Sequence, residues 1–123
     1  MTKFKYDQFG LMPAIIQDAK TRQVLMLAYI NREALLTSLK LKKTCFYSRS
    51  RKKLWIKGES SGHIQKIKSI LTDCDRDTLL ILVSQKGGAC HLGYQSCFVH
   101  LLDQTGKIRR ITEKKVFDPK KIY

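Results

Sequence analysis

The sequence TLLILVSQ, residues 78–85, is continuously apolar from Leu79 to Val83. An unbroken apolar run of this length is typical of a strand that is buried on both faces of a sheet. Gly87 and Gly88 then interrupt the pattern. We therefore expect a buried strand over residues 78–85, and we interpret the neighbouring segments around it.

Two strands and one helix are expected upstream of this strand. Residues 13–17 and 24–29 are β-rich runs separated by a link of hairpin length. Leucines then recur at helical spacing in residues 31–43, where Asn31 can cap the first turn and Glu33 lies favourably within it. We predict a hairpin followed by one clear helix.

The rest of the chain favours short strands over residues 45–48, 53–57, 64–71, 98–102 and 107–112. The spacing in 64–71 is also compatible with a helix. Because the strands come in sequence-adjacent pairs with short links, most pairing should be antiparallel. The predicted class is α+β, with a mostly antiparallel sheet, in a single domain over residues 1–123. The Lys-rich tail, residues 113–123, should be peripheral.

The composition is strongly basic. The 123 residues include 24 Lys and Arg against 10 Asp and Glu, for a formal charge of +14. Such an excess attracts nucleic acid, acidic lipid or phosphorylated small molecules, and it is equally compatible with a surface that is basic for no specific reason. No run approaches the roughly 20 apolar residues of a membrane span, and the N-terminus does not resemble a signal peptide. We expect a soluble, cytoplasmic protein that does not bind membranes.

The sharpest chemical signal is DCDRD, residues 73–77. If this segment is extended, Asp73, Asp75 and Asp77 share one face and Cys74 points to the other. Three neighbouring carboxylates repel one another unless a cation, solvation or protonation relieves them, and hard oxygen ligands suit Mg²⁺. The segment is therefore a candidate magnesium site. The alternative is a solvated acidic turn.

Cysteines are the second signal. Cys74, Cys90 and Cys97 fall close together in the sequence, with His91 nearby, and three thiolates plus a water would form a catalytic zinc site. The alternative is that these cysteines are ordinary small core residues. For Cys45, beside an aromatic residue in a predicted strand, we prefer the core interpretation. If residues 73–77 are extended, a hard metal could lie on the face of the aspartates and a softer metal on the face of Cys74.

A basic segment, residues 40–57, is the third signal. It contains no acidic residue, and its SRSR sequence at 48–51 combines hydroxyls and guanidinium groups that suit phosphate. ESSGH, residues 59–63, adds small donors and a titratable His63. The alternative is a solvated basic edge strand, which we prefer for residues 51–53.

These residues together resemble one known family over about residues 10–99. The matching blocks are MPAIIQD (12–18), VLMLAY (24–29), NREAL (31–35), YSRSR (47–51), LW (54–55), KGESSGH (57–63), Gln65, DCDRD (73–77) and GGACHLGYQSCF (87–98). They look like phosphoribosyl-AMP cyclohydrolase. Leu92 and Gln95 stand where the family often has Thr and Arg, and Tyr47 stands where Trp is common.

The resemblance implies a histidine-biosynthesis hydrolase that cleaves the N1–C6 bond of the adenine ring in phosphoribosyl-AMP. It also implies an obligate, intertwined homodimer with Zn²⁺ and Mg²⁺ as cofactors. The magnesium ligands would be Asp73, Asp75 and Asp77. The zinc would be shared across the dimer by Cys74 of one subunit and Cys90 and Cys97 of the other. His91 would be the catalytic residue, a ligand or proton carrier beside the zinc water. The expected substrate-binding residues are Ser48, Arg49, Ser50, Trp55 and His63.

Two other functions are weighed against this one. A basic nucleic-acid-binding module with a structural zinc fits the charge. However, residues 40–57 lack the regular aromatic and basic interleaving of single-strand binders, and an aspartate cluster does not suit a phosphate-binding face. A zinc nucleobase deaminase would need His-x-Glu and Pro-Cys-x-x-Cys motifs, which are absent. We therefore expect a nucleotide as substrate and no nucleic-acid partner.

Overall fold

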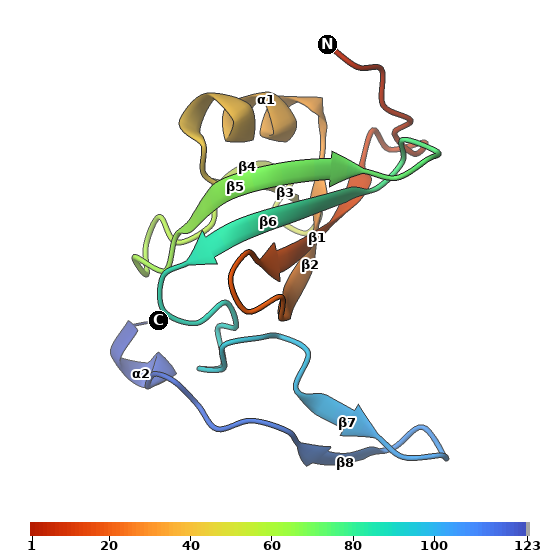
Figure 1. The fold of residues 1–123 in the computed structure, drawn as a ribbon. Coiled ribbons are helices and arrows are strands. Elements are labelled where there is room, and N and C mark those ends of the chain that lie inside the picture. The colour runs from red at the N-terminus through yellow and green to blue at the C-terminus, as the bar shows by residue number, and fades with distance from the viewer. Residues whose placement is uncertain (123) are drawn as a thin grey trace.

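A four-stranded sheet and one main helix form the body of the chain in the computed structural model, which describes residues 1–122 (Figure 1). The chain forms, in order, β1 (Met12–Asp18), β2 (Val24–Ile30), α1 (Arg32–Leu41), β3 (Cys45–Ser48), β4 (Lys53–Ile56), β5 (Gln65–Thr72), β6 (Leu79–Gln85), β7 (His100–Leu102), β8 (Ile108–Ile111) and α2 (Pro119–Ile122). The predicted α+β class is confirmed.

The main sheet has the strand order β2-β1-β6-β5. β6 is an inner strand, and Leu79, Ile81 and Val83 are buried, as the apolar run predicts. The β1–β2, β5–β6, β3–β4 and β7–β8 pairs are antiparallel, which confirms the expected predominance of antiparallel pairing. β1 and β6 are paired in parallel, with Ile16 opposite Ile81.

The helix α1 begins as predicted. The Asn31 side-chain oxygen accepts a hydrogen bond from the Ala34 backbone N–H at 2.8 Å. The helix ends at Leu41, two residues earlier than expected, because Lys42 adopts a left-handed conformation with φ 58°. Neither helix of the described chain is long and apolar enough to cross a membrane.

Residues 65–72 settle the ambiguity in the sequence. They form β5, which pairs along its length with β6, so the helical alternative is wrong. A register shift between Ile67 and Ser69 explains the mixed pattern, because it breaks the alternation of half-buried and exposed residues along this edge strand.

The core lies between the sheet, α1 and the β3–β4 hairpin. Phe46 in β3 is 0% exposed, and its ring lies 5.1 Å from that of Trp55 in β4. The Ser38 hydroxyl in α1 accepts a hydrogen bond from the Cys45 backbone N–H at 2.9 Å. These contacts hold the β3–β4 hairpin against the helix.

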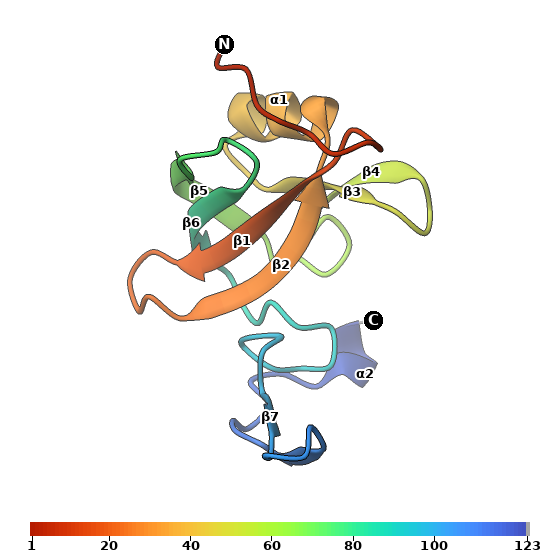
Figure 2. The same cartoon turned by 90° about the vertical axis from the view of Figure 1, so that its right-hand side faces the viewer.

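The β7–β8 hairpin lies apart from the main sheet, below it in Figures 1 and 2. Its strands carry apolar side chains that are open to solvent in the single chain. Leu102 is 58% and Ile108 is 62% exposed. We call residues 98–112 the C-terminal arm. It is joined to the body through buried Val99, which packs with Cys90 and Tyr94. The Val99 carbonyl also accepts a hydrogen bond from the Thr112 N–H at 2.8 Å, which closes the base of the arm.

Candidate functional site

The three aspartates converge in the turn that connects β5 to β6. Oxygen atoms of Asp73, Asp75 and Asp77 lie within 4.8 Å of one another, and all three residues are exposed. The condition of an extended backbone is not met, because residues 73–77 reverse direction and Arg76 has φ 59°. The argument that placed Cys74 on the opposite face of a strand therefore does not apply, although the carboxylates do meet.

Hydrogen bonds within this turn make the aspartates unequal. Asp73 accepts from the Asp77 backbone N–H at 3.1 Å. Desolvation alone would raise the pKa of Asp73, but hydrogen bonds from Asp77 and neighbouring backbone groups outweigh it and lower that pKa. The hydrogen bond with Asp73 raises the pKa of Asp77. Opposite pKa shifts of this kind are typical of carboxylates that lie close together. A bound cation would relieve the repulsion between them.

The N-terminal segment braces the turn from outside. The Lys5 backbone N–H donates to the Arg76 carbonyl at 2.7 Å. This bond ties the left-handed residue of the turn to a segment far away in sequence. The position of the aspartates therefore depends on more than the β5–β6 hairpin.

Cys90 and Cys97 form a thiol pair at the other end of β6. Cys90 is buried and Cys97 is partly buried. Burial, together with the charge and hydrogen bond of Cys90, raises the pKa of Cys97 to about 11. The Cys97 backbone N–H donates to the Leu25 carbonyl at 2.7 Å, which anchors the pair to β2. Two adjacent sulfurs in a sheltered site are half of a zinc ligand set.

Cys74 lies far from this thiol pair within one chain. It precedes β6, whereas Cys90 follows it, and the seven residues of β6 span about 23 Å at the usual rise of a strand. Thiolates bound to one zinc lie within roughly 4 Å of each other, given a zinc–sulfur bond of about 2.3 Å. A single chain therefore cannot bring all three cysteines to one ion. Cys45 is buried in the core, as expected.

His91 opens onto a cavity of about 360 Å³ next to the thiol pair. Its other lining residues are Arg51, Trp55, Ile56, Lys57, Gly58, Glu59, Ser60 and Ser61. The structure thus brings His91 and Trp55, both predicted site residues, to one cavity. Lys57 is a site residue that was not predicted, because in the sequence it is one of many basic side chains in residues 40–57 and the first residue of the KGESSGH block.

Arg49 lies in a second hollow. Its guanidinium carbon lies 4.0 Å from the centre of the Tyr29 ring, and Tyr47 and Lys52 also line this space of about 490 Å³. The Ser48 hydroxyl accepts a hydrogen bond from the Arg51 N–H at 3.2 Å and lies 3.4 Å from the Ser50 hydroxyl. Of the expected substrate residues, Trp55 therefore lines the first cavity and Arg49 the second hollow, whereas Ser48 and Ser50 line neither.

His63 belongs to neither hollow, and it packs against the C-terminal tail. Its ring lies 4.5 Å from that of Phe117, edge to face, and its Nδ1 is buried without a hydrogen-bond partner in the described structure. A Cβ atom at Gly87, where φ is +64°, would lie 2.5 Å from the His63 ring. Only glycine fits there, which explains one of the two glycines before the thiol pair.

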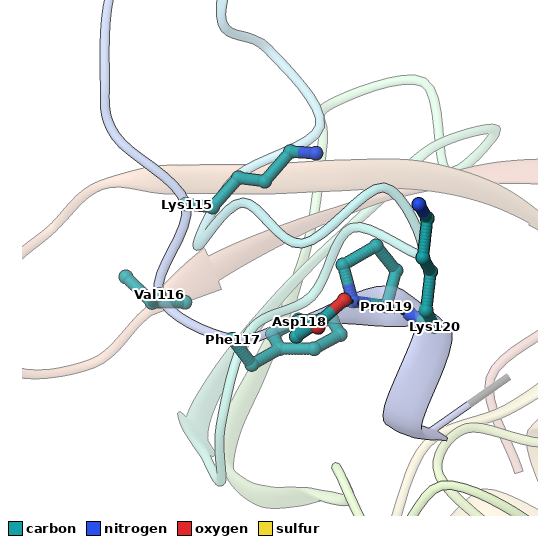
Figure 3. Close-up of a pocket in the computed structure, with 6 residues that line it drawn as sticks. All are labelled: Lys115, Val116, Phe117, Asp118, Pro119 and Lys120. Atoms are coloured by element: carbon teal, nitrogen blue, oxygen red, sulfur yellow. Dashed lines mark hydrogen bonds between the residues drawn. The ribbon is translucent and has the colours of Figure 1, made fainter.

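The tail is less peripheral than predicted. The Val116 backbone N–H donates to the Gly93 carbonyl at 2.8 Å, and Phe117 lies beneath the loop of residues 87–93. Figure 3 shows the side chains of residues 115–120. The stem of Lys115 also lies against the loop, because a Cβ atom at Gly93 would be 3.2 Å from the Lys115 Cδ. Val116 and Phe117 hold the tail against the loop of residues 87–93, and the Lys-rich composition around them did not indicate this contact.

Comparison with known proteins gives the same family over most of the chain. The sequence model of the family described as phosphoribosyl-AMP cyclohydrolase matches residues 26–99. A protein of that name from Chlorobium phaeobacteroides is 54% identical over 119 residues, which cover 97% of this chain and 86% of the relative. Another, from Pelotomaculum thermopropionicum, is 53% identical over 123 residues, covering 100% of this chain and 95% of the relative. The chain therefore belongs to the phosphoribosyl-AMP cyclohydrolase family.

Proposed function

We propose that this protein hydrolyses the N1–C6 bond of the adenine ring in phosphoribosyl-AMP, as a step of histidine biosynthesis. The observation that carries this activity is the identity of more than half of the residues with cyclohydrolases along nearly the whole chain. The thiol pair, the aspartate turn and the cavity that His91 lines provide groups suited to the chemistry.

A homodimer would complete the zinc site. Cys90 and Cys97 supply two sulfurs, and Cys74 of the partner subunit would supply the third, because the Cys74 of the same chain lies at the far end of β6. The C-terminal arm supports this assembly. Its exposed apolar side chains are typical of a surface that a second copy of the chain covers.

Magnesium would be held by Asp73, Asp75 and Asp77, whose oxygens are close enough to share one ion. Zinc, when bound, supplies Lewis acidity that makes water a stronger acid near neutral pH. In the hydrolysis the oxygen of water bonds to C6 and the N1–C6 bond breaks. One proton of that water reaches N1, and the other reaches the exocyclic nitrogen on C6, which becomes the carboxamide NH₂. His91, which lines the cavity, would carry the proton that reaches N1.

The remaining polar groups would bind the nucleotide. Trp55 gives the first cavity an aromatic surface for the purine, and Arg49 and Lys52 give the second hollow two cations for phosphate. The cytoplasm is the expected location for such a biosynthetic enzyme.

The direct test is turnover of phosphoribosyl-AMP by the protein loaded with zinc and magnesium, followed by the absorbance change on ring opening. AMP, which lacks the ribosyl group on N1, is the control and should stay intact. If the fully loaded dimer leaves phosphoribosyl-AMP unchanged, the proposed activity is wrong.

Asp75→Asn should weaken magnesium binding by about tenfold or more, because it removes one charge from an oxygen ligand set. The measurement is a calorimetric magnesium titration of zinc-loaded protein. Asp103→Asn is the matched control, because Asp103 also lies in a tight turn, where it is partly exposed and its carboxylate accepts a hydrogen bond from the Thr105 N–H at 2.8 Å. Equal magnesium affinity in the two variants would contradict the proposed site.

Zinc binding should release protons, and the zinc affinity should rise with pH. The pKa of Cys97 is about 11, so its thiol is protonated near neutrality and must lose its proton to bind zinc. Below that pKa, the affinity should increase about tenfold per pH unit for each proton released. A pH indicator in weak buffer reports the release, which should shrink in Cys97→Ser. An affinity that is independent of pH would argue against thiolate ligation.

A further inference from the structure

Lys57 is a buried cation without a carboxylate partner. Its side chain is only 7% exposed, and its ammonium group donates a hydrogen bond to the Ala89 carbonyl at 2.7 Å. Within residues 1–122 it forms no ion pair with Asp or Glu. Its other contact is the Trp55 ring, whose centre lies 5.9 Å from the Lys57 Nζ. A buried ammonium with only neutral partners is costly, so its presence calls for a nearby negative charge.

The charges that act on Lys57 come from the thiol pair. Burial lowers the pKa of Lys57, whereas the negative charge that Cys97 and Cys90 acquire when they lose their protons raises it. The hydrogen bond to Ala89 also fixes the residue that directly precedes Cys90. The ammonium thus lies beside the thiol pair and holds its backbone.

The Lys57 ammonium can offset the net negative charge of a zinc ion bound by thiolates. Three thiolates around one Zn²⁺ carry a net charge of about −1, and this excess weakens the Lewis acidity that makes zinc useful. An ammonium held beside two of the sulfurs brings the local charge close to zero. Because the site is buried, this interaction is poorly screened by solvent.

We propose, on the basis of the function proposed above, that Lys57 is the counter-ion of the zinc centre. It is a positioning residue that offsets the negative charge of the cysteine ligands and fixes the backbone before Cys90. The competing role is direct binding of substrate phosphate, because Lys57 also lines the cavity with His91. Zinc binding in the absence of substrate separates these two roles.

The test compares Lys57→Met, which keeps the length of the side chain but removes its charge, with Lys57→Arg, which keeps the charge. Lys53→Met is the matched control, because Lys53 is an exposed lysine in neighbouring β4. Zinc affinity is measured by competition with a chromogenic chelator, using metal-depleted full-length protein and no substrate. We expect an affinity loss of about tenfold or more in Lys57→Met, substantial recovery in Lys57→Arg and no change in Lys53→Met.

Thermal stability separates charge balance from a packing role. Without zinc, Lys57→Met should melt at or above the wild-type temperature, because a buried, unpaired charge has been removed. With zinc, it should gain less stability than the wild type. If Lys57→Met lowers the melting temperature equally with and without zinc while its zinc affinity is normal, Lys57 is only a packing residue and the assignment is overturned.

Kinetics separates the inference from the proposed function. We expect Lys57→Met to lower kcat with little change in KM, whereas an increase in KM alone, with normal zinc affinity, would assign Lys57 to substrate and overturn the counter-ion role. A wild-type protein that does not turn over phosphoribosyl-AMP, but whose zinc affinity depends on Lys57, supports the counter-ion and refutes only the activity. A wild-type protein that binds no zinc overturns the counter-ion role.

Discussion

Cys74→Ser and Cys97→Ser should each abolish most turnover, by about 100-fold or more, yet a mixed dimer of the two variants should recover about half of the wild-type activity. The reason is the geometry of β6, which places Cys74 and the thiol pair at opposite ends of one strand. In the mixed dimer, one proposed zinc site contains both serine substitutions, and the other keeps all three cysteines. The dimer is obtained by co-expression with two different affinity tags, and its turnover of phosphoribosyl-AMP is measured.

The matched control is a mixed dimer of Cys90→Ser and Cys97→Ser. Both substitutions fall in the same half of the proposed site, so each zinc centre retains one lesion and no activity should return. Recovery in this control, or no recovery in the Cys74→Ser and Cys97→Ser pair, would show that the ligands are not divided between subunits as proposed.

Phe46→Ala should lower the free energy of unfolding by about 3–5 kcal/mol, a large share of the roughly 5–15 kcal/mol of a typical domain. Phe46 is 0% exposed and packs on Trp55 between the main sheet and α1, so truncation leaves a cavity that the surrounding core cannot easily fill. The measurement is urea unfolding of metal-free protein at one fixed concentration, because metal and dimerisation both shift apparent stability.

Phe9→Ala is the control for this experiment. Phe9 is 77% exposed, so the same truncation removes little buried surface and should change stability by less than about 0.5 kcal/mol. Similar losses in the two variants would mean that Phe46 is not the centre of the core, and that the β3–β4 hairpin contributes little to stability.

The strands and the helix start could be predicted from the sequence because their signals are local. The apolar run of β6 and the cap at Asn31 depend on neighbouring residues alone, and the structure confirms both. The convergence of Asp73, Asp75 and Asp77 was also anticipated, but through the wrong backbone. An antiparallel β5–β6 pair requires a reversal between Thr72 and Leu79, and this requirement overrides an extended conformation.

Lys57 and Phe117 could not be assigned because their roles depend on distant contacts. A lysine in a basic segment ordinarily faces water, and only the tertiary packing against residues 89–97 buries it. Phe117 lies in a Lys-rich tail, and its contact with His63 joins residues far apart in the sequence. No periodicity in either segment signals these contacts.

The parallel pairing of β1 with β6 has a consequence for how the protein is made. β1 emerges early from the ribosome, but its partner on one side is synthesised only after β2, α1 and the β3–β4 hairpin. During this interval the early hairpin presents an unpaired strand edge, which is prone to pair with other chains. Closure of the sheet is therefore a late, long-range event, and folding should be slower than the many short hairpins suggest.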